Sequence, residues 1–476
     1  MAYGYGIQPA GGGRQGEQGM RRWLVRIGIA LLALAVILAA LWGFSRLRGP
    51  SAEQRAALAL FDQIPEPTGR NAWPLAWLLQ WDVPFAELER VAAEDAARFA
   101  ALPPPGDAAR EPAVAAFQSV AAERYRDLAP LLADEPASCG LRESGCLAHV
   151  RSDRQAHAER LAAAVELVDR VEALADYDHM YRPLPPALDE LYPRAWGLGL
   201  AKTRHALWFV DGEHDRALAG SCRAIAGQRR LATHSDTLLF SMLWMSALGD
   251  QTTLLAEMLA ELPAGHTLPS ECGQALAPLQ PHELGICEAM RGEWQLGASA
   301  MAWIQPSPSA AQRLQMKLVY DQEATDALRA GYLAWPCSEE AAHLRAQDLP
   351  VQVPETPGGL GRVECWANLV GCILTDIAAP AYVTYESRAQ DAAARIRLLQ
   401  ALVWMRGQVA DGDTRDTRAL LAASPQLPRG GPRRIEVDED GTGLRMALFN
   451  PQRDTHWAIP LPPQLHVPAA TATSGH

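Results

Sequence analysis

The chain has 476 residues, 49% of them hydrophobic, which is enough for two or three domains or one extended helical array with a large core. Its formal net charge is -12 at pH 7. Residues 1–45 contain four arginines and one glutamate, a net charge of +3, so the remaining residues carry -15. An acidic body argues against binding to nucleic acid or anionic lipid by charge.

One apolar run dominates the N-terminal region. No charged residue occurs from Ile27 to Ser45, and a helix of that length can cross a bilayer of roughly 30 Å. A cleaved signal peptide is the main alternative, but no small-x-small cleavage site follows, and the run is long for a signal sequence. A buried core helix is typical of shorter runs. We therefore predict an anchor at 22–45 after a short cytoplasmic tail, 1–21, within which Met20 is an alternative translation start.

Arginines and cysteines both indicate where the body lies. Three arginines closely precede the run and two follow it, a slight bias that favours a cytoplasmic N-terminus. All eight cysteines come after the run, an even number that is typical of an oxidising compartment such as the bacterial periplasm. Buried free thiols are the alternative. The disulfide candidates are Cys139, Cys146, Cys222, Cys272, Cys287, Cys337, Cys365 and Cys372.

The body begins with two recognisable segments. Ser51-x-x-Gln54 has the form of a capping box, which predicts a helix starting there. Residues 71–81 are apolar all round, and Trp73 and Trp77 share one helical face. This pattern predicts a buried helix. A tryptophan-rich segment at the membrane surface is the alternative.

The middle of the chain reads as a series of helices. The most regular part is 187–262, with turns at Asp211-Gly212 and at 233–236. Within it, the stretch 204–218 resembles a helix-turn-helix pair of an α-solenoid, although no fixed period assigns a repeat family. The helices are predicted over 82–101, in two pieces about Pro112, over 147–175, in three helices ending at Val210, Leu231 and Leu262, and over about 282–303, 309–334 and 362–411.

The C-terminal region changes character. Residues 434–449 alternate apolar and polar side chains around Asp440-Gly441, which predicts a β-hairpin. The segment from His456 adds a third short strand. Three strands are too few for an independent sheet, so they are expected to pack on the helical body.

The standard catalytic motifs are absent from the sequence. It contains no His-Glu-x-x-His, no Gly-x-Ser-x-Gly, no Ser-x-x-Lys and no Gly-x-x-x-x-Gly-Lys. The cysteine spacings also differ from those of zinc ribbons. We therefore assign no catalytic residue and predict no cofactor.

Three isolated stretches offer candidate chemistry. Asp176-Tyr-Asp-His179 places metal-capable side chains in one loop, where aspartates also favour turns. Glu213-His214-Asp215 is explained by the preference of acids for a helix N-terminus. Glu386-Ser387 resembles the Glu-Ser pair of lytic transglycosylases, but the Gly-Leu-Met-Gln-type stretch of that family is missing. Glu386 is therefore interpreted as part of a solvated helix face.

The spacing of the cysteines gives a set of predicted pairs. Cys365 and Cys372, if helical, lie two turns or about 10 Å apart, too far to bond. The glycine-flanked loop 139–146 can close locally. Loop proximity then predicts the pairs Cys139–Cys146, Cys272–Cys287, Cys337–Cys365 and Cys222–Cys372, out of the 105 pairings that eight cysteines allow.

Together these patterns predict a mostly α protein with a single transmembrane helix. The tail 1–21 and the anchor 22–45 precede an irregular, α-solenoid-like periplasmic body at 46–430, and 431–476 form a β-hairpin and loose tail. Helical arrays of this kind present binding surfaces. The predicted function is protein binding at the bacterial inner membrane, in envelope assembly, secretion or neutralisation of a toxin. A periplasmic hydrolase acting on an envelope component is the alternative.

Overall fold

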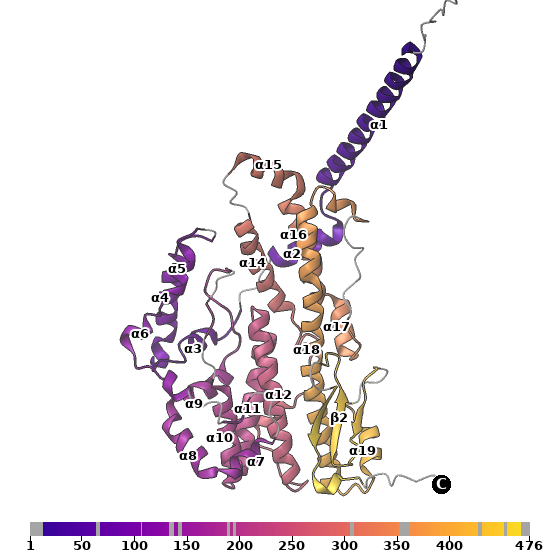
Figure 1. Cartoon of the computed structure of the whole chain (residues 1–476). Helices are drawn as coiled ribbons and strands as arrows, with labels where there is room; N and C mark the ends of the chain where they lie inside the picture. The colour runs from indigo at the N-terminus through magenta and orange to yellow at the C-terminus, as the bar shows by residue number, and fades with distance from the viewer. Residues whose placement is uncertain are drawn as a thin grey trace, which may run out of the picture.

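The computed structural model describes residues 13–62, 67–105, 107–132, 138–140, 145–187, 191–193, 197–304, 309–351, 361–426, 431–451 and 455–467. This part of the chain is mostly helical, with a small antiparallel sheet near its C-terminal end (Figure 1). The helices are α1 (Gly13–Leu47), α2 (Ala52–Asp62), α3 (Trp73–Trp77), α4 (Leu88–Ala100), α5 (Arg110–Ala115), α6 (Ala121–Arg124), α7 (Cys146–Ser152), α8 (Arg154–Ala163), α9 (Val165–Ala173), α10 (Leu198–Val210), α11 (His214–Thr233), α12 (Leu238–Glu261), α13 (Glu271–Ala275), α14 (Cys287–Ile304), α15 (Ala310–Val319), α16 (Gln322–Ala334), α17 (Glu339–Ala346), α18 (Leu369–Ala410) and α19 (Thr417–Ala423).

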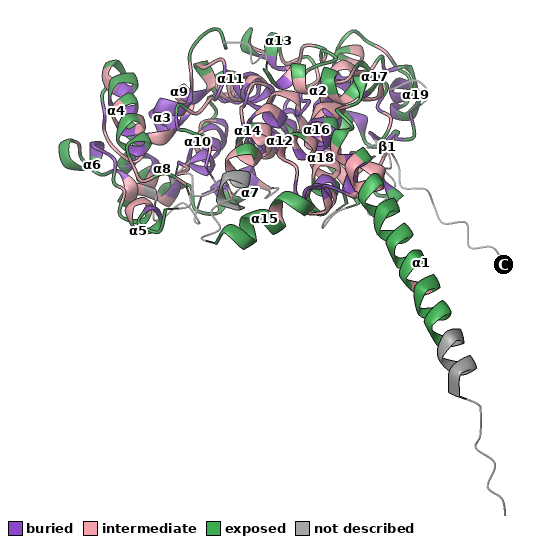
Figure 2. Cartoon of the chain, turned by 90° about the horizontal axis from the view of Figure 1, so that it is seen from above, coloured by how far each residue is buried: buried purple, intermediate pink, exposed green. Residues whose placement is uncertain are grey.

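The predicted apolar N-terminal helix is confirmed as α1, which projects away from the body (Figures 1 and 2). Its stretch Met20–Leu47 spans 28 residues, long and apolar enough to cross a membrane. No residue of its most apolar window is buried inside the protein. The alternative of a buried core helix is therefore wrong.

The last turns of α1 contact the body. The indole Nε1 of Trp42 donates a hydrogen bond of 2.8 Å to the carbonyl of Leu318, just before the end of α15. The hydroxyl of Ser45, which is buried, accepts one of 3.1 Å from the backbone N–H of Ala367. Arg46 forms an ion pair of 3.0 Å with Asp321, at the start of α16. These bonds fix the exit of α1 against α15, α16 and the segment before α18.

The first segments of the body follow their local sequence signals. The backbone N–H of Gln54 donates to Ser51 Oγ at 3.1 Å, and that of Ser51 donates to Gln54 Oε1 at 2.8 Å, which is the reciprocal capping box predicted before α2. Trp73 is fully buried and stacks on Trp77 with ring centroids 5.1 Å apart. The buried interpretation is therefore confirmed, although the helix ends at Trp77, and Trp81 forms a β-bridge with Asp127 instead of a helical turn.

Two long helices predicted from the sequence are broken in the structure. The stretch 147–175 divides into α7, α8 and α9, and 309–334 divides into α15 and α16. Aspartates stand at breaks in both stretches: the side chain of Asp153 accepts from the N–H of Ala156, and that of Asp321 accepts from the N–H of Ala324. Aspartate is a preferred N-cap, so each one ends the preceding helix by starting the next.

The core lies where α10, α11, α12 and α18 pack together, as the buried residues in Figure 2 show. The predicted ends of α10 and α12 at Val210 and Leu262 are correct to within one residue, and α11 ends two residues beyond Leu231. Helix α12 has buried side chains on all its faces. This matches its largely apolar sequence.

The predicted C-terminal hairpin is confirmed. Strand β1 (Ile435–Val437) pairs antiparallel with β2 (Gly443–Ala447), which pairs with β3 (His456–Pro460). Gly441 adopts a φ of +74° in the turn, a conformation that favours glycine. The sheet packs on α18 and α12. Arg433, just before β1, is buried and forms ion pairs with Asp348 and Asp391. Its Nη1 lies 2.6 Å from Oδ1 of Asp391.

The eight cysteines lie in four pairs at disulfide-bonding distance, and only one predicted pairing is correct. Cys139 and Cys146 have Cα atoms 5.5 Å apart, as predicted. The other three predicted pairings are wrong, because helix packing decides which cysteines meet. The observed pairs are Cys222–Cys272, Cys287–Cys337 and Cys365–Cys372, with Cα separations of 4.8, 4.8 and 5.7 Å.

The pair Cys365–Cys372 corrects a specific assumption about secondary structure. The two cysteines do not share a helix, because Cys365 ends a 3₁₀ turn, Val363–Cys365, and α18 starts only at Leu369. The chain bends between them, so their Cα atoms approach far more closely than two turns of one helix allow.

Candidate functional site

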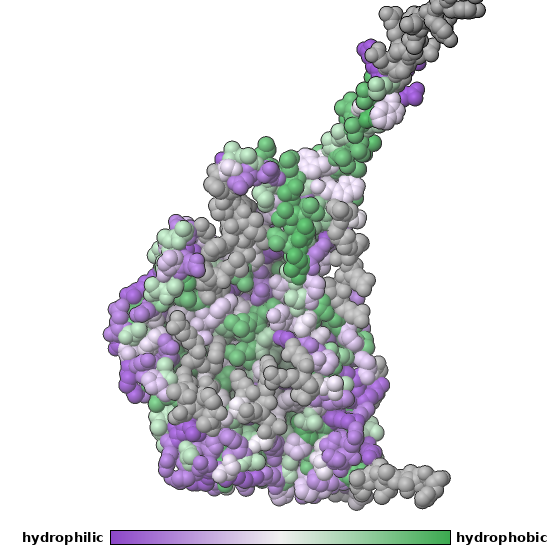
Figure 3. Space-filling model, in the orientation of Figure 1, coloured by the Kyte–Doolittle hydropathy of each residue, from purple (hydrophilic) through white to green (hydrophobic). Residues whose placement is uncertain are grey.

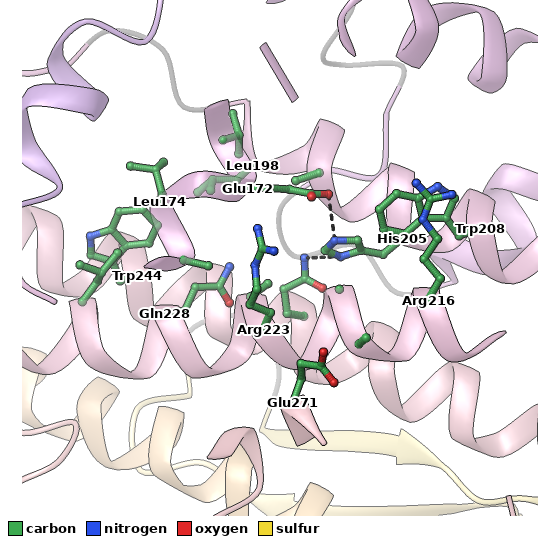
Figure 4. Close-up of a pocket in the computed structure, with 18 residues that line it drawn as sticks. Glu172, Leu174, Leu198, His205, Trp208, Arg216, Arg223, Gln228, Trp244 and Glu271 are labelled. Carbon is green, nitrogen blue, oxygen red and sulfur yellow. Dashed lines mark hydrogen bonds and ion pairs between the residues drawn. The ribbon is translucent and has the colours of Figure 1, made fainter. Parts of the chain in front are cut away.

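A cavity of about 210 Å³ lies at the end of the body opposite α1, between α9, α10, α11 and α12 (Figure 4). Its inner wall is apolar and aromatic, and its rim carries exposed charged side chains. The aromatic, charged and amide side chains that line it are Glu172, His205, Trp208, Arg216, Arg223, Gln228, Trp244, Gln251 and Glu271.

Glu172, from α9, is held by two side chains of α10. Its Oε1 accepts a hydrogen bond of 2.7 Å from Arg204 Nε and lies 3.1 Å from His205 Nε2. Arg204 also pairs with Asp169, one turn earlier on α9. Burial raises the pKa of Glu172, but the hydrogen bonds from His205 and Arg204 outweigh it and lower the pKa to about 2. The carboxylate is therefore ionised at neutral pH.

His205 is the most enclosed titratable side chain of the cavity, at 1% exposed. Its Nε2 lies against Glu172 and its Nδ1 lies 3.5 Å from the amide nitrogen of Gln251 on α12. A Cβ at Gly220 would come within 2.8 Å of the imidazole ring. Glycine at this position of α11 therefore lets the two helices approach closely enough to enclose the ring.

Trp208, one turn beyond Arg204 on α10, lies close to two guanidinium groups. The Cζ atom of Arg204 lies 5.2 Å from its ring centroid, and that of Arg216 lies 4.0 Å away. Both distances are within the range of cation–π attraction. Figure 4 shows Arg216 and Trp208 together at one end of the cavity.

Gln228 and Arg223 supply the polar groups nearest the apolar wall. Gln228 is buried, and its Oε1 has no hydrogen-bond partner among the described residues. Arg223 is exposed on the rim, with its Nε 3.6 Å from an oxygen of Asp176. Figure 4 shows both side chains between Trp244 and His205. A ligand that donates to Gln228 and carries a carboxylate toward Arg223 would satisfy both groups.

The loop 176–179, singled out as a possible metal site, does not gather its side chains. Asp176 faces Arg223, whereas Asp178 accepts a hydrogen bond of 2.8 Å from the backbone N–H of Arg70. His179 is buried against the ring of Tyr181, and burial lowers its pKa. Throughout the described ranges, no group of three or more His, Cys, Asp or Glu side chains is arranged to hold a metal ion.

The other two sequence candidates also lie apart from the cavity lining. His214 packs on Phe209, with ring centroids 4.7 Å apart, and the neighbouring Asp215 lies 3.0 Å from His266. Glu386 is 1% exposed and accepts a hydrogen bond of 2.8 Å from Arg345. The interpretation of Glu386 as a solvated residue is therefore wrong. Burial raises its pKa, although Arg345 partly opposes the shift.

The residues of the cavity were missed because they come from separate helices. Glu172 and His205 are 33 positions apart, and only the packing of α9 on α10 joins them. One signal did exist: Arg204, Trp208 and Arg216 fall within 204–218, the stretch with helix-turn-helix character.

Comparisons with protein-family models, with curated proteins and with solved structures find no match to this chain. The geometry of the cavity and of the α1 junction is therefore the basis for a functional proposal.

Proposed function

We propose that this chain is a protein-binding module tethered to the bacterial inner membrane. Helix α1 anchors it, the solenoid-like helical body lies in the periplasm, and the cavity between α9, α10, α11 and α12 receives a carboxylate-bearing segment of a protein partner. Such a module serves envelope assembly, secretion or the neutralisation of a toxin.

Retention of α1 is supported by its contacts with the body. Cleavage at the end of the apolar run would expose the buried surroundings of Ser45 and remove the ion pair between Arg46 and Asp321. The four cysteine pairs support an oxidising compartment. The arginine bias around α1 supports the same orientation.

The observation that carries the binding role is the lining of the cavity. Tryptophan and arginine are among the residues most often found as energetic anchors of protein interfaces, and here Trp208, Arg216 and Arg223 all line the cavity, the first two together at one end (Figure 4). The Oε1 of Gln228, which has no partner among the described residues, gives the inner wall an acceptor for a donor on the ligand.

Affinity purification of the full chain from detergent-solubilised membranes tests the proposal, followed by binding measurements with the purified partner. Trp208→Ala and Arg223→Ala should each weaken binding about tenfold or more, as expected for an interface anchor. Arg98→Ala, a change at an exposed arginine on α4, is the matched control and should leave affinity unchanged. Equal affinity of all three variants would contradict this binding site.

A periplasmic hydrolase remains the second candidate, because His205 hydrogen-bonded to a carboxylate is an arrangement used in acid–base catalysis. The two candidates differ in their response to His205→Gln. In an enzyme that uses this histidine, turnover of an envelope component falls by orders of magnitude while folding is retained. In a binding module, the affinity for the partner changes modestly, and neither the wild type nor the variant turns over an envelope component.

A further inference from the structure

Helix α15 exposes an apolar face that the body does not cover. None of its residues is buried, and Leu314 and Leu318, four positions apart on one face, are 62% and 50% exposed. The first turns of α18 also expose apolar side chains: Ile373 is 48% exposed and Ile377 is 72% exposed. Figure 3 shows hydrophobic surface at this end of the body, from which α1 leaves.

This apolar face lies next to α1, the candidate membrane span, and this position indicates a lipid bilayer as the medium that covers it. Trp42, near the end of α1, donates its indole N–H to the carbonyl of Leu318, so the C-terminal end of α15 lies where α1 leaves the body. Figures 1 and 2 both show α15 on the side of the body toward which α1 extends. The face is therefore continuous with the apolar surface of the candidate membrane span.

The polar side of α15 carries positive charge. Arg313 and Lys317 are four positions apart, beside the row formed by Leu314 and Leu318. Lys317 is one of only two lysines in a chain whose body is strongly acidic. Basic side chains flanking an apolar face are typical of helices that lie in the headgroup region of a membrane, where long cationic side chains reach back toward water.

We propose that α15 and the first turns of α18 form a second membrane contact, which lies in the interface of the bilayer that α1 crosses. This inference rests on the anchoring role of α1 but not on the binding role of the cavity. A spanning helix alone leaves the body free to tilt. A second contact beside it fixes the orientation of the body and holds the cavity, at the opposite end, away from the bilayer.

Spin labelling of the full chain in nanodiscs of phosphatidylcholine and phosphatidylglycerol tests the proposal. The native cysteines are paired, so Leu314→Cys and Ile377→Cys each provide one reactive thiol, and Val165→Cys on α9 is a control of similar exposure. Labels at 314 and 377 should lose collisions with a water-soluble relaxation reagent and gain collisions with oxygen when the protein enters the nanodisc. The label at 165 should not change.

The possible failures separate the two proposals. If the protein co-elutes with nanodiscs but all three labels stay equally accessible to water, the interfacial contact is wrong and the anchor stands. If the protein does not co-elute with nanodiscs, the anchor itself fails. If protection at 314 and 377 appears without lipid and grows with protein concentration, a second copy of the chain covers the face and the membrane contact is wrong.

Discussion

The two ends of the body solve opposite packing problems. At the end that carries α1, the apolar side chains of Leu314 and Ile377 point outward and the body does not cover them. At the other end, the charged side chain of Glu172 points inward and is held by Arg204 and His205. Exposed apolar surface needs another medium or partner, whereas an enclosed charge needs an opposite charge. The first end therefore fits the proposed membrane contact, and the second fits the proposed binding site.

This difference between the two ends predicts which substitutions lower the stability of the fold. Side chains around the cavity are tied to several helices at once, so a change there propagates into α9, α10 and α11. Side chains on α15 contribute little to folding because none of them is buried in the folded chain. Three experiments compare the two ends by the free energy of unfolding of the full chain in one detergent.

The largest loss of stability is expected from the longer-range of two disulfide pairs. Cys222–Cys272 links α11 to α13 near the cavity across a separation of 50 residues, whereas Cys365–Cys372 closes 7 residues beside α1. Because the unfolded chain loses more freedom when a longer loop is closed, replacing the first pair by alanines should cost about 4 kcal/mol, and the second about 2 kcal/mol. Denaturant unfolding of the two double variants measures both. A larger loss from the short loop would reverse the comparison.

A smaller effect is expected from Glu172→Gln, which leaves Arg204 and His205 without their shared anion. Removing one partner of an enclosed ion pair should cost about 3 kcal/mol at pH 7. The pKa of Glu172 in the folded protein, about 2, is below its ordinary value of 4.5. The ionised carboxylate therefore contributes its full stabilisation above pH 4.5, and this contribution is lost as the pH falls toward 2. The difference between wild type and variant should close over that range.

The matched control for this titration is Glu111→Gln, at an exposed position on α5. Its stability difference from wild type should stay small at every pH. If the Glu172→Gln difference persists unchanged down to pH 2, the carboxylate does not owe its effect to ionisation, and the far end of the body is not held by charge.

The smallest effect is expected on α15. Leu314→Ala should change the free energy of unfolding by less than about 0.5 kcal/mol, because an exposed side chain loses no buried contacts. Leu248→Ala, at a fully buried leucine of α12, should cost about 2–5 kcal/mol by leaving a cavity. A comparable cost at Leu314 would mean that α15 is part of the folded core, which would remove the contrast between the two ends.

Features with local causes were predictable from the sequence. The apolar run of α1, the capping box of Ser51 and Gln54, and the hairpin about Asp440-Gly441 each depend on residues within a few positions of one another. The breaks at Asp153 and Asp321 had equally local causes, but they were missed because hydrophobic periodicity continues across them. Those errors show that a capping side chain can outweigh an apolar pattern.

Only the tertiary structure decided the cysteine pairs, the cavity and the burial of Glu386. Cys222 meets Cys272, Glu172 meets His205, and Glu386 meets Arg345 across helices that are far apart in the chain. The sequence determined that a long apolar helix precedes a helical body, because hydrophobic transfer and helix capping act within one segment. It did not determine which faces of those helices meet, because many pairings bury similar apolar area, and the choice depends on the fit of side chains across each interface.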